Sequence, residues 1–69
     1  MSVYKVIELI GTSETSWEDA ARQAVDKARS SLRHLRIVEV NKLDIKLDEQ
    51  GHIAAYRARL NVSFKYEDT

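Results

Sequence analysis

The chain has 69 residues, with eleven basic and eleven acidic side chains and therefore no net charge. It contains no cysteine and no proline, which excludes disulfides and cysteine-ligated zinc, and its length leaves room for one domain, residues 1–69. A chain of this size buries only about 60% of its unfolded surface, so we expect oligomerisation to supply stability. Neutral charge argues against nucleic acid or an anionic membrane as a partner. No apolar run approaches membrane-spanning length, and we expect a cytoplasmic protein.

The first half of the chain predicts a strand followed by a helix. Residues 3–10 are rich in valine and isoleucine and predict a strand that is paired on both sides. Residues 11–16 predict a loop in which Ser16 caps a helix and Asp19 is the acid of a capping box. The helix is expected over residues 17–33, because its apolar side chains follow helical spacing: Trp17, Ala20, Ala21, Ala24, Val25, Ala28 and Leu32.

The second half predicts a hairpin of two long strands. Residues 37–47 alternate in two phases that change near Asn41, which indicates a β-bulge. Residues 48–51 predict a turn with Gly51 at positive φ. Residues 56–66 then alternate strictly between apolar and polar side chains. The order is β-α-β-β in an α+β fold, with one helix covering one face of the sheet. The other face is left without cover, which favours packing against copies of the same chain.

No sequence motif of a known catalytic site is present, so we do not expect an enzyme. The two histidines, His34 and His52, are interpreted as a helix-end residue and a residue after a turn. Histidines at such places more often have a structural role than a catalytic one.

Four acidic residues are candidate metal ligands. One acid near a three-fold axis supplies three carboxylates in an oligomer, and carboxylate oxygens are ligands that calcium prefers. The alternative is a solvated turn, or an ion pair with a neighbouring subunit. The candidates are Glu14, Asp44, Asp48 and Glu49.

Two further groups of side chains allow two interpretations each. Trp17 lies on the apolar face of the helix, which favours packing in the core or in an interface over stacking on a planar ligand. Arg57, Arg59 and Lys65 form a basic stripe at strand spacing. They are candidates to bind phosphate groups, or to form ion pairs with Glu39, with Asp44 or with another subunit.

Three segments together resemble the dodecin family over essentially the whole chain: VYKVIELIGTS at the start, ARSSLRHLRIVEV after the helix, and YRARLNVSFKYEDT at the end. The resemblance implies a helix packed on a three-stranded antiparallel sheet. It also implies a homododecamer in the form of a hollow sphere.

Many dodecins bind riboflavin or FMN between subunits, and the resemblance assigns that pocket to Ile37, Asp44 and Arg57. Flavin-binding members have tryptophan, arginine and glutamine there, so this chain lacks the stacking ring and the amide. Lys65 aligns with a position that faces a phosphate-bearing ligand in some members. The sequence is most similar to the branch described as calcium-binding, which also lacks the tryptophan.

These observations predict a non-enzymatic binding and storage shell that holds small ligands or ions, with calcium as the expected cation. The metal candidates are then Glu14, Asp48 and Glu49. One alternative is a flavin-binding dodecin with a weak pocket, and a second is a purely structural oligomer.

Overall fold

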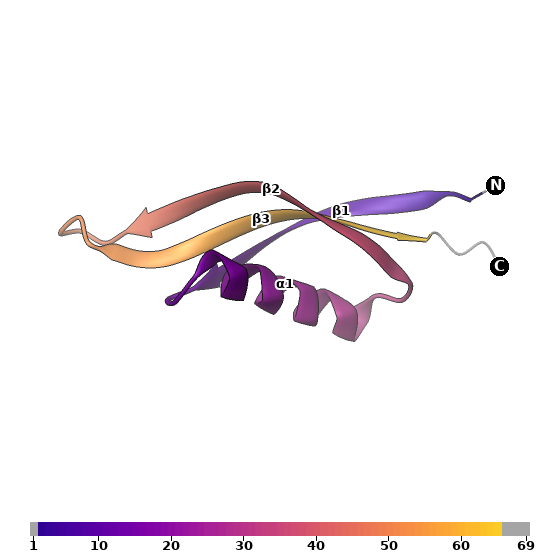
Figure 1. Ribbon diagram of the computed structural model, residues 1–69, viewed down its shortest axis with the longest axis horizontal. Helices are drawn as coiled ribbons and strands as arrows, with labels where there is room; N and C mark the ends of the chain where they lie inside the picture. Colours follow the sequence, from indigo (N-terminus) through magenta and orange to yellow (C-terminus); the bar gives the residue numbers. More distant parts are fainter. Residues whose placement is uncertain (1, 66–69) are drawn as a thin grey trace.

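The computed structural model describes residues 2–65. Its elements are β1 (Tyr4–Ser13), α1 (Trp17–Ser31), β2 (Leu35–Leu47) and β3 (Ile53–Lys65). The strands form one antiparallel sheet in the order β1-β3-β2, and α1 runs along one face of it (Figure 1). The predicted β-α-β-β order and the α+β fold class are therefore confirmed.

The environment of β1 differs from the prediction in two ways. β1 is an edge strand of this sheet and pairs only with β3, so pairing on both sides is wrong for a single copy. Apolar side chains at alternate positions show that both faces of the sheet are apolar at this strand. They do not show whether another strand pairs with each of its edges. Residues 11–13 also continue the strand, because Gly11 pairs with Ala58 and Ser13 with Tyr56. The predicted loop is thus shorter than residues 11–16.

The helix begins where its cap predicts and ends two residues early. The Ser16 Oγ accepts a hydrogen bond from the Asp19 backbone N–H at 3.0 Å. This bond satisfies a donor that the first helical turn leaves without a partner. α1 ends at Ser31 rather than residue 33, and Leu32 is already extended with its N–H bonded to the Ala28 carbonyl. His34, at φ 60°, redirects the chain into β2.

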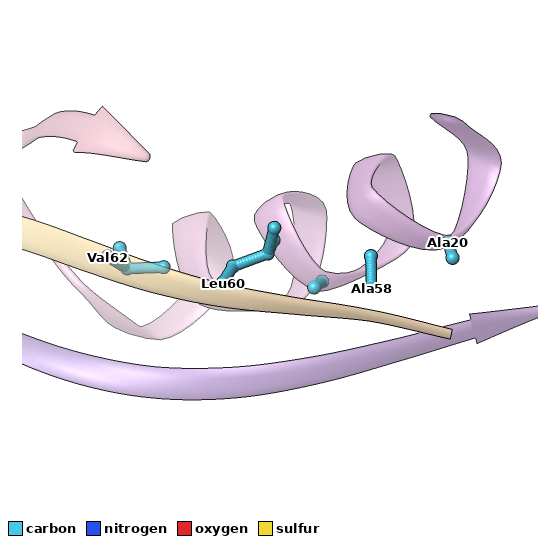
Figure 2. Packing of buried hydrophobic residues seen from close by; sticks show 5 residues of the cluster. Ala20, Ala58, Leu60 and Val62 are labelled. Atoms are coloured by element: carbon cyan, nitrogen blue, oxygen red, sulfur yellow. The ribbon is translucent and has the colours of Figure 1, made fainter. Parts of the chain in front are cut away.

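The core lies between α1 and the central strand. Ala20 and Ala24 of α1 form one buried cluster with Ala58, Leu60 and Val62 of β3, and Ala28 of α1 is buried as well. Figure 2 shows how closely the helix lies against the strand. The alternating pattern predicted this face of β3 correctly, and its last member, Tyr66, lies outside the described residues. Leu60 and Val62 are the largest side chains in residues 2–65 that are fully buried. A core of mainly alanine removes little apolar surface from water.

The hairpin of β2 and β3 extends beyond the helix. Its register shifts between Val40 and Lys42, which confirms the predicted bulge. The turn is held by Asp48, whose Oδ1 accepts the backbone N–H groups of Gln50 and His52, both at 2.9 Å. Gly51 has the expected positive φ, 84°.

The molecule is elongated, as Figure 1 shows, with extents of 52 × 19 × 16 Å and a radius of gyration of 14.2 Å. A compact domain of this length has a radius of gyration of about 11 Å. Within residues 2–65, no helix has the length and apolar character needed to cross a membrane.

Candidate functional site

The sheet face opposite α1 is covered by no element of the described chain. Because Ala58, Leu60 and Val62 face the helix, the residues of opposite parity point away from it. The strand register then places their neighbours on the same side. We call this surface the open face, and define it by Tyr4, Val6, Glu8, Ile10 and Thr12 on β1, Ile37, Glu39, Lys42, Asp44 and Lys46 on β2, and Arg57, Arg59, Asn61, Ser63 and Lys65 on β3.

Asp44 and Arg57 form a two-pronged ion pair on the open face. They are cross-strand partners, and Arg57 donates from Nε to Asp44 Oδ1 at 2.7 Å and from an Nη to Oδ2 at 2.9 Å. The hydrogen bond from Arg57 is the main cause that lowers the pKa of Asp44, and the charges of Arg57, Arg59 and Lys42 act in the same direction against partial burial. The same bond raises the pKa of Arg57. Of the two interpretations of Arg57, the structure therefore supports ion pairing with Asp44.

Trp17 supports this pair from the other side of the sheet. Its indole Nε1–H donates to the Asp44 backbone carbonyl at 3.0 Å. Its ring meets the ring of Tyr56 edge to face, with 5.2 Å between centroids and 74° between planes. Trp17 thus connects the start of α1 to both β2 and β3, as the packing interpretation predicts.

Ile37 does not lie near the ion pair within one copy of the chain. It is cross-strand partner to Ser63, whereas Asp44 is partner to Arg57, six residues along β3. At about 3.3 Å per residue this separation is roughly 20 Å. Ile37 is 65% exposed and lines a shallow hollow with Val6, Glu39, Asn61 and Ser63. A ligand that contacts Ile37, Asp44 and Arg57 together would need a site shared between copies.

The predicted basic stripe of Arg57, Arg59 and Lys65 does not form one cluster either. Lys65 is partner to Tyr4 near the end of the sheet, six residues along β3 from Arg59. Arg59 is instead the cross-strand partner of Lys42. The sequence reasoning missed Lys42, because its place on the open face depends on the bulge between Val40 and Lys42.

The candidate metal ligands are not brought together within one copy. Glu14 lies in the turn before α1, while Asp48 and Glu49 lie in the hairpin turn. Asp48 already accepts two backbone hydrogen bonds, and Asp44 is paired with Arg57. Across residues 2–65, no group of three or more histidine or acidic side chains is placed to hold a metal ion.

A second polar cluster, which sequence reasoning had seen only as a helix cap, joins β1 to α1. The buried Ser13 donates from Oγ to Asp19 Oδ2 at 2.7 Å, and Gln23 Nε2 donates to the same oxygen at 2.8 Å. The bond from Ser13 is the main cause that lowers the pKa of Asp19. The capping-box spacing was the signal for Asp19, and nothing in the sequence marked Ser13. The cluster fixes the strand-to-helix connection.

Comparison with known proteins covers nearly the whole chain. The family model described as Dodecin matches residues 3–67. A curated calcium dodecin from Mycobacterium tuberculosis is 54% identical over 65 residues, which are 94% of this chain and 90% of that protein. A dodecin from Thermus thermophilus is 42% identical over 67 residues, with 97% of this chain and 96% of that protein covered.

Solved structures of similar proteins have the same fold as this chain. The crystal structure of the M. tuberculosis calcium dodecin, described as having a novel calcium-binding site, superposes with a TM-score of 0.86 at 50% identity over 99% of this chain and 96% of that one. The structure of the T. thermophilus protein tt0972 gives 0.88 at 40% identity, with both chains fully covered. This chain belongs to the dodecin family. Members are binding and storage proteins rather than enzymes, and the fold family is known to assemble as dodecamers.

Proposed function

We propose that the protein is a non-enzymatic, cytoplasmic binding shell of twelve copies that sequesters a divalent cation, with calcium as the preferred ion. The observation that carries this proposal is the 54% identity, over 94% of the chain, to a protein named calcium dodecin. A relation of that strength supports the same ligand class more directly than it supports the flavins of other family members.

The surface of a single copy supports the assembly. Ten large apolar side chains among the described residues are at least 39% exposed, on both faces of the sheet. Val6 and Ile37 lie on the open face, whereas Val40, Leu43 and Ile45 lie on the helix side, beyond the cover of α1. Apolar area on this scale in so small a chain is typical of protein–protein interfaces.

The scattered carboxylates support a cation site made by symmetry. Glu14 and Glu49 are exposed, and neither side chain forms an ion pair within residues 2–65. A site that takes one or two carboxylates from each of several copies reaches the six to eight oxygen ligands of calcium without a cluster in any one copy. Asp48 would contribute its Oδ2, since Oδ1 holds the turn.

A flavin is the second candidate ligand, because Ile37 lines an open hollow of about 660 Å³ on the open face. Two features weaken this alternative. Isoleucine has no ring to stack on a flat heterocycle, where an aromatic contact contributes about 1–3 kcal/mol. Arg57, at the position that the resemblance assigns to a glutamine, already donates to Asp44 and offers no acceptor.

Calcium removal provides the test. We expect the melting temperature to rise with calcium and fall with EDTA, by an amount equivalent to about 2.7 kcal/mol when free calcium is 100 times its Kd. Magnesium at the same concentration and ionic strength separates a specific site from general screening. Glu14→Gln and Glu49→Gln should each reduce the calcium response.

The matched control is Asp26→Asn, which removes one negative charge from the exposed face of α1 and breaks only the ion pair with Arg29. This variant should retain the full calcium response. A melting temperature that neither calcium nor EDTA changes would contradict the cation proposal, and leave the flavin or a purely structural shell.

A further inference from the structure

The charges of the open face are unevenly distributed. Lys42, Lys46, Arg57 and Arg59 lie on the hairpin part of this face, and Asp44 is the one acidic residue that the register places among them. Four basic residues against one acidic residue leave a local excess of three positive charges on a chain with no net charge. We call these five residues the basic patch.

Asp44 neutralises only one member of the basic patch. Both of its carboxylate oxygens accept hydrogen bonds from Arg57. Among the described residues, no carboxylate forms an ion pair with Lys42, Lys46 or Arg59. Glu8 on β1 and Glu39 on β2 are both partners of Asn61 and lie diagonally across from Arg59, but neither forms an ion pair with it. The Glu8 Oε2 instead accepts from Asn41 Nδ2 at 3.5 Å.

Lys42 and Arg59 are therefore a like-charged pair directly opposite each other on adjacent strands. Like charges in this arrangement destabilise an antiparallel pair, whereas opposite charges stabilise it. The register thus brings together two cations whose repulsion an anion between their head groups would relieve. Arg59 is half-buried, so its side chain is held by its neighbours. Lys42 is exposed, so its ammonium group is accessible to an anion from solvent.

We propose that Lys42 and Arg59 form a binding site for a phosphate or diphosphate group, with Lys46 adding long-range attraction. A guanidinium fork matches the geometry of phosphate oxygens, and an ammonium adds a mobile point charge. This site is separate from Lys65, six residues along β3 from Arg59, and it is independent of the calcium proposal.

The experiment measures pyrophosphate binding to the full chain by isothermal titration calorimetry. EDTA is kept in excess, so that chelation of calcium by pyrophosphate produces no signal, and the ionic strength is held constant with sodium chloride. We expect saturable binding that weakens as salt is added. Lys42→Gln and Arg59→Gln should each raise the Kd about tenfold, the scale expected when one hydrogen bond to a charged group is lost.

The matched control is Lys27→Gln, which removes the same charge from an exposed position on α1. It should bind pyrophosphate as the unmodified chain does. ADP separates the two sources of the ligand: equal affinities for ADP and pyrophosphate indicate free diphosphate, and tighter binding of ADP indicates a nucleotide. Absence of saturable binding, or equal weakening by Lys27→Gln, would overturn the proposal.

A second measurement covers the case in which a variant changes the fold. Without any added anion, Lys42→Gln should melt at the same temperature as the unmodified chain or higher, because it removes the repulsion from Arg59. Pyrophosphate should raise the melting temperature of the unmodified chain, and should raise that of the variant by a smaller amount at the same concentration. A variant that melts lower without anion, yet gains the full pyrophosphate shift, would contradict the site.

Discussion

At the scale of single residues, Gly11 sets how closely the helix approaches the sheet. A Cβ at this position would collide with the Ala20 backbone carbonyl of α1 and would lie 3.1 Å from the Ala24 Cβ. The facing alanines of α1 and Ala58 of β3 are small enough for the same close approach. The strand continues through Gly11, which pairs with the buried Ala58 of β3.

Gly11→Ala should therefore strongly destabilise the protein. The backbone of α1 cannot move away from the new methyl group without opening the core, and overpacking of this kind typically costs about 1–3 kcal/mol. Urea denaturation followed by circular dichroism measures the loss. The control is Gly51→Ala in the hairpin turn, where φ is 84° and no atom lies within 4 Å of the added Cβ. There only the left-handed backbone costs stability, about 1–2 kcal/mol. An equal or smaller loss for Gly11→Ala would contradict the close-approach argument.

At the scale of elements, the sequence predicted those features that depend on local pattern. Capping by Ser16, the alternation of β3 and the bulge after Val40 are all present in the structure. Features that depend on tertiary neighbours were missed. The pattern of β1 could not show which strand lies beside it, and the helix ends at Ser31 because the chain reverses at His34 rather than because its apolar pattern stops.

For the candidate site, the sequence likewise predicted the residues but not which of them are neighbours. Asp44 and Arg57 were both singled out, and pairing between them was one interpretation, but only the hairpin register makes them direct partners. The register also separates Ile37 and Lys65 from this pair and brings Lys42 to Arg59. The bulge after Val40 decides the relations of Lys42 and Asp44, because one extra residue moves every following side chain of β2 to the other face.

The Asp44–Arg57 pair should make the stability of the hairpin depend on pH in acid. The pKa of Asp44 is lowered from 3.8, so its ionised form is favoured by folding. This contribution is fully present above the unfolded pKa and is lost as the pH falls through the lower, folded pKa. We expect the urea midpoint of the unmodified chain to fall as the pH decreases from about 4, and to fall less steeply in Asp44→Asn.

Arg57→Gln should also flatten the acid dependence, because it removes the main cause of the lowered pKa of Asp44. A remaining slope is expected in both variants from Asp19, whose pKa is lowered mainly by its hydrogen bond from Ser13. Parallel curves for the unmodified chain and Asp44→Asn would show that the ion pair contributes nothing to stability in acid.

At the scale of the whole molecule, a single copy has too little core for its length. The described residues have two large side chains that are fully buried, Leu60 and Val62, and the rest of the buried apolar core is alanine. The hairpin extends past α1, so that apolar residues on both of its faces have no cover from the same chain (Figure 1). Folding and assembly should therefore be coupled, since the surfaces left exposed in one copy are the ones that copies would bury.

Native mass spectrometry tests the assembly directly. Twelve copies of a 7.9 kDa chain give a species of about 95 kDa. Because folding and assembly are coupled, we also expect the melting temperature to rise with protein concentration, and dilution to yield unfolded chains rather than folded monomers. Any excess over the protein mass would distinguish calcium ions from a flavin in the same spectrum. A folded monomer whose melting temperature is independent of concentration would contradict the shell, and with it every cation site that requires carboxylates from several copies.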